Sequence, residues 1–496
     1  MTLYADWKAP KSDQEHLIWP APDRIVESTL RNTAALAKLD DVRLLGVPVS
    51  RLRSDARKLL GAGDEPLIAT GHQIEMYHPG VWVKNVLIDQ IARKASGRAV
   101  HLAVDTDTPK HLQLRWPGGS VLMSDDAGIL DAGWSGLVSP PTERHYQKMC
   151  ATFRSAADSW AFEPAMDSFF SGFSRSLGAP TLAAAIIEGA TELDQSLGLD
   201  VQFAIIDLLI DSDAYLAMAY HIIADIERFA VAYNTALAEY RQREGISSPS
   251  RPMPDLRIET DRIELPFWTD DLQSQDRARA VAVRVGAVWA LDAGDGGEPL
   301  HFDPAQDAYA AAAALRAFLL AHQIRLSPRA LTLTMFFRLL LVDQFVHGIG
   351  GARYDQVTDR ILADYFRLAP PAFSVTTGTL FFPGGAGPSD VCVPCIVSEG
   401  HRLRHNVLES KTQYLTSITS APRKSMQRRQ HYLAMHRDLT QAAGVSQRIS
   451  EWRQRLAATI ERQERELVLA DRELFYGLQT RERLTAMIDR YRIAFG

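Results

Sequence analysis

The sequence predicts an α/β protein with a parallel-sheet core, helical insertions and a long helical C-terminal part. Short apolar runs at 67–69 and 99–104 are typical of buried strands, and a segment with helical periodicity separates them. A strand, a helix and a second parallel strand form a right-handed crossover unit. In the C-terminal stretch 449–495, apolar side chains recur at steps of three, four and seven residues, which indicates long amphipathic helices.

The loop after the first predicted strand carries many polar side chains. It reads Thr-Gly-His-Gln and leads to Pro79-Gly80, where a helix begins. Ligands of open α/β sheets bind beyond the carboxyl ends of the strands and against helix N-termini. An ordinary polar turn with solvated histidines is the alternative. The candidate residues in and beside this loop are Thr70, Gly71, His72, Gln73, His78, Lys84 and Asn85.

A second polar cluster follows the second predicted strand. It runs from Asp105 through Asp107 to Lys110 and His111. Because the carboxyl ends of neighbouring parallel strands lie at the same edge of a sheet, two strands that both end in acids, histidines and lysine favour one convergent site over two solvated turns.

A third polar stretch follows the apolar segment 335–346, which the sequence predicts to be a helix. Three glycines in four residues then expose backbone N–H groups and permit close approach of an anion. The loop lacks the Gly-Lys-Ser/Thr end of a Walker A loop, and it does not follow a predicted strand as a G-x-G-x-x-G fingerprint does. A glycine turn between two helices is the alternative. The candidate binding residues here are His347, Gly348, Gly350, Gly351, Arg353 and Asp355.

Shifts in composition and periodicity divide the chain into three parts. Residues 1–60 are a helical lead-in, residues 61–420 form the core, and residues 421–496 are helical and coiled-coil-like. A mostly helical insertion at about 143–254 interrupts the core. The last part carries 15 Lys+Arg against 9 Asp+Glu, whereas the rest carries 39 against 51. We expect a homodimer through the C-terminal helices, with packing on the chain's own body as the alternative.

Composition excludes several classes of function. A chain of 496 residues with 46% hydrophobic and 23% charged residues is typical of a soluble globular protein, and a net charge of −6 gives no general affinity for nucleic acid. No apolar run approaches the roughly 20 residues that span a membrane, and no signal-peptide pattern opens the chain. Three cysteines make no disulfide framework, so the expected compartment is the cytoplasm.

Two of the cysteines belong to a possible metal-binding pattern. Cys392 and Cys395 form a C-x-x-C pair, and His401 and His405 follow as H-x₃-H, a composition found in zinc sites. The five-residue gap between Cys395 and His401 is much shorter than in zinc fingers. Alternating apolar residues around the cysteines favour a strand with buried thiols, so zinc is not the expected cofactor.

These stretches resemble the bacillithiol synthase family, the cysteine-adding enzymes of bacillithiol biosynthesis. The resemblance rests on Thr70–Gln73, on Pro79–Trp82 at the start of the next helix, on the polar run 105–111 and on the glycines before Tyr354. It covers nearly the whole chain. It implies a Rossmann-like core interrupted by helical segments and followed by a helical coiled-coil domain.

The resemblance also implies a ligase-type condensation, which forms an amide between an amino acid and an amine-bearing small molecule. His72 or His78 would act as general base. Asp105 and Asp107 would orient an ammonium group, or Mg²⁺ if ATP is used. The groups that would hold carboxylates or phosphates are Lys84, Arg353 and the backbone of 348–351.

Two other functions are compatible with the same residues. One is a nucleotidyltransferase-like enzyme, in which the loop after the first strand binds the phosphates of a nucleotide. The other is a non-enzymatic scaffold, in which the basic C-terminal helices bind a partner. Titration with ATP and Mg²⁺ separates a nucleotide-binding enzyme from a nucleotide-independent one. The sequence identifies neither the substrate nor a cofactor.

Overall fold

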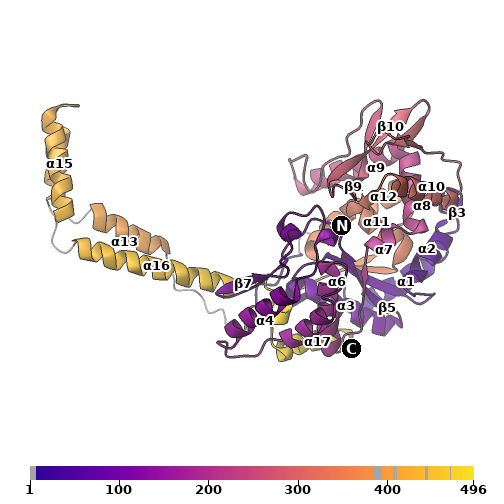
Figure 1. Cartoon of the computed structure of the whole chain (residues 1–496), viewed down its shortest axis with the longest axis horizontal. Coiled ribbons are helices and arrows are strands. Elements are labelled where there is room, and N and C mark those ends of the chain that lie inside the picture. The colour runs from indigo at the N-terminus through magenta and orange to yellow at the C-terminus, as the bar shows by residue number, and fades with distance from the viewer. Residues whose placement is uncertain (1–6, 384–392, 406–407, 409, 442–444, 470) are drawn as a thin grey trace. The chain divides into compact units, whose positions relative to one another are not determined.

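A computed structural model describes residues 7–383, 393–405, 408, 410–441, 445–469 and 471–496 (Figure 1). The chain forms two compact units, one of Met1–Pro383 with Arg472–Gly496 and one of Gly384–Asp471. The sequence predicted a boundary at 420. The observed division lies earlier, and the last helix belongs to the first unit.

The first unit contains a six-stranded sheet with the strand order β1-β15-β14-β4-β5-β8. Five strands are parallel, and β1 pairs antiparallel at one edge. The predicted strands at 67–69 and 99–104 are confirmed as β4 and β5. The strands are β1 (His16–Trp19), β4 (Leu67–Gln73), β5 (Arg98–Val104), β8 (Gln202–Ile205), β14 (Gln344–His347) and β15 (Phe373–Gly378).

One strand of this sheet, β14, lies in a segment that the sequence predicted to be a helix. The run 335–346 holds the end of α11 (Ala330–Phe336), a π-helical turn at Phe337–Leu341 and then most of β14, so the prediction of one helix was wrong. The run is buried throughout, and a short apolar run shows no periodicity that separates a strand from a helix. Strand β8 lies inside the mostly helical insertion, within the run 201–209 whose sequence is compatible with a strand.

The order of the strands reverses between β4 and β14. The chain passes from β4 through α3 (Pro79–Ala95) to β5, and from β14 through α12 (Ile349–Asp364) to β15. These two helices cover opposite faces: Val375 packs with Ala352 of α12, whereas the next residue, Thr376, hydrogen-bonds to Tyr491 of α17, which contacts α3. Such a reversal leaves a crevice beyond the carboxyl ends of the two strands.

The N-terminal helices hold the starts of these two strands in place. Arg53 and Arg57 of α2 both donate to the carboxylate of Asp343, at 2.6 and 2.8 Å. The same carboxylate accepts the N–H of Leu67, the first residue of β4. All three charged side chains are buried, so this cluster aligns β4 with β14.

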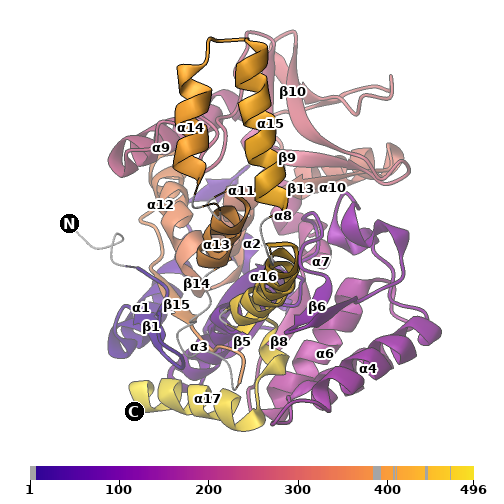
Figure 2. The same ribbon diagram turned by 90° about the vertical axis from the view of Figure 1, so that its left-hand side faces the viewer.

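The sheet is covered by helices on both faces. Figure 2 shows α1, α3 and α17 close together, and these three contact one another. Within the residues that the structure describes, no helix combines the length and the apolarity needed to cross a membrane. The other helices of this unit are α1 (Pro22–Leu36), α2 (Val49–Lys58), α4 (Glu143–Ala157), α5 (Met166–Arg175), α6 (Leu182–Ser196), α7 (Asp207–Ile210), α8 (Asp213–Ala224), α9 (Ile226–Glu244), α10 (Ala308–Ala321) and α17 (Arg481–Phe495).

A second, antiparallel sheet has the strand order β12-β11-β10-β9-β13 and lies beside α9 (Figure 1). Its strands are β9 (Arg262–Asp271), β10 (Arg277–Val285), β11 (Val288–Leu291), β12 (Leu300–His301) and β13 (Ile324–Pro328). Two small pairs are β2 (Arg43–Leu44) with β3 (Val47–Pro48) and β6 (Gln113–Trp116) with β7 (Gly119–Leu122).

The second unit consists of helices that pack in pairs. Helix α13 lies along α16, and α14 lies along α15 (Figures 1 and 2). The Trp452 indole N–H donates to the carbonyl of Ile396 at 2.7 Å, and Arg455 pairs with Glu399 at 2.7 Å. The strand expected around Cys395 is wrong, because a helix begins at residue 393. The helices are α13 (Val393–His405), α14 (Lys411–Ser420), α15 (Met426–Gln441) and α16 (Val445–Leu469).

Candidate functional site

Two cavities lie at the carboxyl ends of β4 and β14, where the strand order reverses. Their volumes are about 580 and 550 Å³, within the range of small-molecule sites. Both are lined by Gly71 and His72 of β4, by His347 at the end of β14 and by Gly351 in the first turn of α12. These four residues therefore form a wall that the two cavities share.

One of the two, here called the cationic cavity, is lined by basic side chains. These are Lys8, Lys84, Arg353 and Arg472, together with histidines, and none of the described residues that line it is acidic. Lys84 and Arg353 were predicted. Lys8 and Arg472 come from distant parts of the chain, and no motif marked them. This lining favours an anionic ligand.

The N-terminus of α12 borders the cationic cavity and has no side-chain cap. Gly348 is its N-cap residue, and no side chain accepts a hydrogen bond from its first turn. Added Cβ atoms at Gly348 and Gly350 would meet nothing within 4 Å, so this backbone faces open space. Because β14 precedes it, the loop is a strand–glycine–helix turn, and not the helix–glycine–helix turn that was the alternative. Free N–H groups at a helix start bind carboxylate or phosphate.

Lys84 is a buried amine in the wall of the cationic cavity. Its Nζ donates to the carbonyl of Gly71 at 2.8 Å. Burial lowers the pKa of Lys84 to about 7, against the opposing effect of Glu75. Burial likewise raises the pKa of Glu75 to about 7. Both groups therefore change charge near neutral pH.

His72 is neutral at pH 7. Burial, and next the charge of Lys84, lower its pKa well below the ordinary value. Its Nδ1 lies 3.0 Å from the carbonyl of Gln73 and 3.4 Å from Glu75 Oε1. A carbonyl only accepts hydrogen bonds, so Nδ1 carries the proton and Nε2 is an acceptor.

His347 is held by a buried carboxylate. Its Nε2 lies 2.8 Å from Asp355 Oδ2, and the same oxygen accepts from Arg338 at 2.6 Å. Burial favours the neutral form of Asp355, but Arg338 and His347 hold the pKa of this carboxyl below its ordinary value. An ionised carboxylate only accepts, so Nε2 carries the proton and Nδ1 is the free acceptor. Arg338 was not predicted, although a lone arginine within the apolar run 335–346 was the available signal.

The second hollow, here called the apolar cavity, is lined mainly by aromatic and aliphatic side chains. Two of its polar lining residues have polar partners: the Gln73 amide donates to the Asp107 carboxylate, and Arg329 pairs with Glu264 at 2.6 Å. The apolar and aromatic lining residues are Val104, Pro252, Met253, Pro254, Trp268, Pro328, Ala330, Leu331, Leu333, Phe337, Phe345 and Tyr354.

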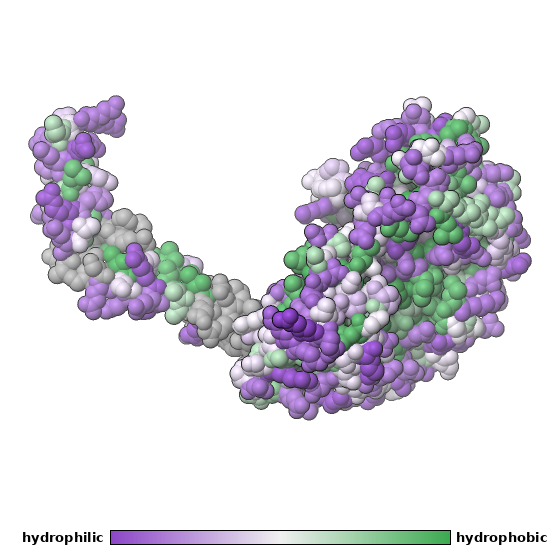
Figure 3. All heavy atoms as spheres, in the orientation of Figure 1, coloured by the Kyte–Doolittle hydropathy of each residue, from purple (hydrophilic) through white to green (hydrophobic). Residues whose placement is uncertain are grey.

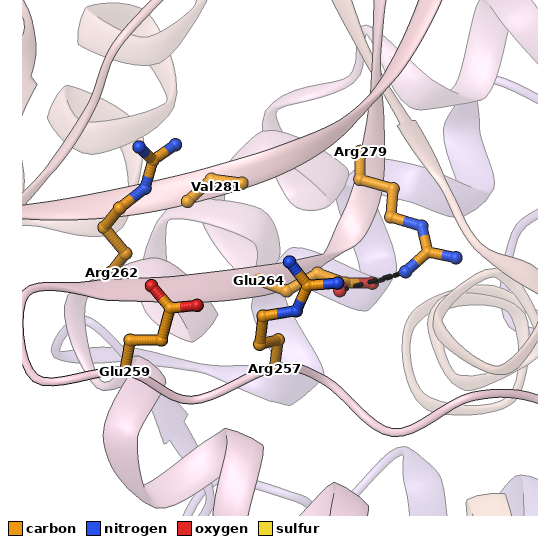
Figure 4. A pocket seen from close by; sticks show the side chains of 6 residues that line it. All are labelled: Arg257, Glu259, Arg262, Glu264, Arg279 and Val281. Atoms are coloured by element: carbon orange, nitrogen blue, oxygen red, sulfur yellow. Dashed lines mark hydrogen bonds and ion pairs between the residues drawn. The ribbon is translucent and has the colours of Figure 1, made fainter. Parts of the chain in front are cut away.

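A third hollow of about 400 Å³ lies on the second sheet (Figure 4). Arg279 points toward Glu264, and their atoms lie 3.2 Å apart. Three arginines and two glutamates line this surface. Their charges largely compensate one another, so this hollow lacks the single-sign charge of the cationic cavity.

Three of the predicted residues line neither cavity. Thr70 is buried and donates to the carbonyl of Val346 at 2.8 Å. Asn85 of α3 is also buried, and its amide donates to the Asp194 carboxylate at 2.8 Å. His111 is exposed, with a left-handed φ of 48°. The structure does not bring these three side chains into the site.

Asp105 also lies outside both cavities, although Asp107 lines the apolar one. Burial raises the pKa of Asp105 to about 7, and the neighbouring Asp207 adds to this effect against Arg325. The two carboxylates therefore do not converge as a Mg²⁺ site would require, and no reaction step is assigned to Mg²⁺.

The described part of the chain contains no group of three or more His, Cys, Asp or Glu side chains placed to hold a metal ion. Of the four predicted zinc ligands, Cys395 lies on α13. Cys392 and the side chains of His401 and His405 lie outside the described residues.

Known proteins offer no identification. No family model and no curated protein matches this chain. A fold alone does not define a function, so the chemistry of the two cavities is the basis for the proposal that follows.

Proposed function

We propose that the chain is a bacillithiol-synthase-like enzyme with a Rossmann-like core, which joins an amino acid to an amine-bearing small molecule through an amide bond. One observation supports this most strongly: His347, hydrogen-bonded to Asp355, lies in the wall that a cationic and an apolar cavity share. Two cavities of different polarity that share one general base, His347, are suited to two substrates that react with each other.

The residues of this site have distinct roles in such a reaction. Arg353, Lys84 and the free N–H groups of α12 would hold an anionic group of the amine-bearing substrate. Its amine nitrogen would attack the carboxyl carbon of the amino acid and lose a proton to Nδ1 of His347. The carboxyl oxygen leaves as water, or as phosphate when the acid arrives as an acyl phosphate.

Mass spectrometry tests this proposal. Purified full-length protein is incubated with amino acids and a panel of amine-bearing acids, with and without ATP and Mg²⁺. The expected product has the summed mass of the two substrates less one water, and His347→Gln should reduce its formation by about 10²–10⁴-fold. The proposal fails if no pair of substrates gives an amide.

A nucleotidyltransferase-like enzyme is the second candidate. The uncapped N-terminus of α12 favours it, because such a turn binds phosphate as readily as carboxylate. Calorimetric titration with ATP distinguishes the two candidates. Tight binding of ATP together with the absence of any amide product would favour the nucleotide enzyme.

We also propose that the helices of the second unit form a coiled-coil homodimer contact. Figure 3 shows apolar side chains between polar ones along this unit. The exposed apolar residues on these helices are Val397, Leu415, Met426, Tyr432, Leu433 and Ile460. Light scattering should give the mass of two chains, and Leu433→Glu combined with Met426→Glu should give one. A wild-type protein of single-chain mass contradicts the proposal.

A further inference from the structure

The wall of the apolar cavity contains a row of rings. Phe337 and Phe345 have centroids 5.9 Å apart with planes 20° apart, and Phe345 lies 4.6 Å from the ring of His347. Trp268 of β9 lines the same cavity. Aromatic pairs are favourable at centroid separations of about 4.5–7 Å, so an added ring in the cavity would extend this row.

The cations beside the rings already have partners. Glu264 accepts from Arg329 at 2.6 Å, and the Arg329 guanidinium lies over Trp268, 5.4 Å from the ring centroid. Asp355 is likewise occupied by Arg338 and His347, as described above. The interior of this cavity therefore offers an apolar surface with neutralised charges.

Asp107 is the remaining carboxylate of the apolar cavity. It is only partly buried, and its described side-chain partner is the Gln73 amide, which carries no charge. A carboxylate with a neutral partner is a site for an ammonium group. On the other side, the shared wall leads to the cationic cavity, which attracts a carboxylate.

We infer that the apolar cavity binds an α-amino acid with an aromatic side chain, its ring beside Trp268 and Phe337 and its ammonium group at Asp107. This inference rests on the proposed function and specifies the amino acid substrate. A side chain as small as that of cysteine or alanine would leave most of a cavity of about 580 Å³ as water against apolar walls.

Calorimetric titration of the full-length protein tests the inference. L-phenylalanine and L-tryptophan should bind at least about tenfold more tightly than L-alanine and L-cysteine. Asp107→Asn should weaken binding of L-phenylalanine but not of 3-phenylpropanoate, which lacks the ammonium group. Equal binding of large and small amino acids overturns the inference.

A cavity-filling variant provides an independent test. Thr334 lines the cavity, is partly exposed, and donates to the carbonyl four residues before it. Thr334→Phe should therefore abolish binding of L-phenylalanine. Thr152→Phe is the matched control, because Thr152 makes the same helical hydrogen bond on the exposed face of α4.

Sulfate distinguishes failure of this inference from failure of the proposed function. It should bind the cationic cavity of wild type and of Thr334→Phe equally. If sulfate binds and amide products form, but Thr334→Phe still binds L-phenylalanine, only the aromatic assignment is wrong. If neither sulfate binding nor amide formation is observed, the proposed function itself fails.

Discussion

The loops after β4 and β5 carry similar side chains but have different surroundings. Both strands end in a polar run, and the two strands pair in parallel along their whole length. His72, near the end of β4, lines both cavities together with Gly351, which follows β14. Asp105, directly after β5, is buried near Arg325 of the second sheet.

The difference shows that the neighbouring strand decides what a polar loop can do. At the strand reversal, β4 and β14 both lead to helices that begin at one crevice. Beyond β5, the second sheet covers the loop: Arg277 of β10 donates to the carbonyl of Thr106 at 2.6 Å. The polar residues of the loop after β5 therefore connect the two sheets. Asp107 is the exception, because it lines the apolar cavity.

The largest expected effect compares catalysis at the strand reversal, represented by His347, with catalysis at the loop after β5, represented by Asp105. His347→Ala should lower turnover by about 10²–10⁴-fold, because it removes the proposed proton acceptor. Asp105→Asn should leave turnover nearly unchanged, because its side chain lies outside both cavities. Amide formation measured under the same conditions checks both variants. Loss of activity in Asp105→Asn with normal folding would place the loop after β5 in the active site.

The second-largest expected effect is a loss of folding stability when the charged network that covers the loop after β5 is broken. The fully buried Asp270 carboxylate accepts from Arg277 and Arg325, at 2.6 and 2.9 Å, and from Ser327 at 2.6 Å. Asp270→Ala leaves two guanidinium groups without this partner and should cost about 3–5 kcal/mol of unfolding free energy.

Urea unfolding measures this loss. Asp261→Ala is the control, because Asp261 is exposed and directly precedes the same strand. If the two variants have equal stability, the Asp270 network does not hold the sheets together.

A third effect depends on pH. The pKa of Asp105 is about 7 in the folded chain against 3.8 ordinarily, so the folded state binds more protons between these values. The contribution of Asp105 to the unfolding free energy therefore falls as pH rises from about 4 to 7. Asp105→Asn removes this titration and should be more stable than wild type by roughly 2–4 kcal/mol above pH 7, but not at pH 4. Unfolding at both pH values checks the sign, and a constant difference would contradict it.

Part of the site could be predicted because its residues belong to local sequence patterns. The polar residues that follow the apolar run 67–69 form one such pattern, and the glycines at 348–351 form another. Residues of both patterns line the cationic cavity. Arg472 could not be found in this way, because it comes from a distant segment that only the tertiary fold brings back. Asn85 was assigned to the site for a similar reason. Its amide instead donates to a buried partner, the Asp194 carboxylate, which is distant in sequence.

The fold was predictable to the level of an α/β class with parallel strands. Strand β14 was missed because residues 335–346 are mostly apolar and buried throughout, so neither strand nor helix periodicity is visible. This error hid the strand–glycine–helix geometry at Gly348. The helix around Cys395 was missed because valines at alternating positions imitate a strand, although contacts with α16 select the helix.

A smaller effect tests the charge of the cationic cavity. Lys84 is protonated below its pKa of about 7, so sulfate affinity should fall as pH rises through 7. Glu75 ionises over the same range and strengthens this fall. Lys84→Met should lose roughly tenfold in sulfate affinity at pH 6 and should show a weaker pH dependence. Titrations at pH 6 and 8 measure both values, and a pH-independent affinity in wild type would exclude Lys84 from the site.

The smallest expected effect comes from alanine substitutions at two adjacent glycines of α12. A Cβ on Gly351 would lie 3.0 Å from Nδ1 of His347, the proposed proton acceptor, whereas a Cβ on Gly350 would meet nothing within 4 Å. Gly351→Ala should therefore lower turnover severalfold by displacing the ring, with little change in stability. Gly350→Ala should raise the unfolding free energy by up to about 1 kcal/mol, because alanine loses less backbone entropy in a helix. If both variants turn over equally, Nδ1 of His347 does not need its present position and is not the atom that accepts the proton.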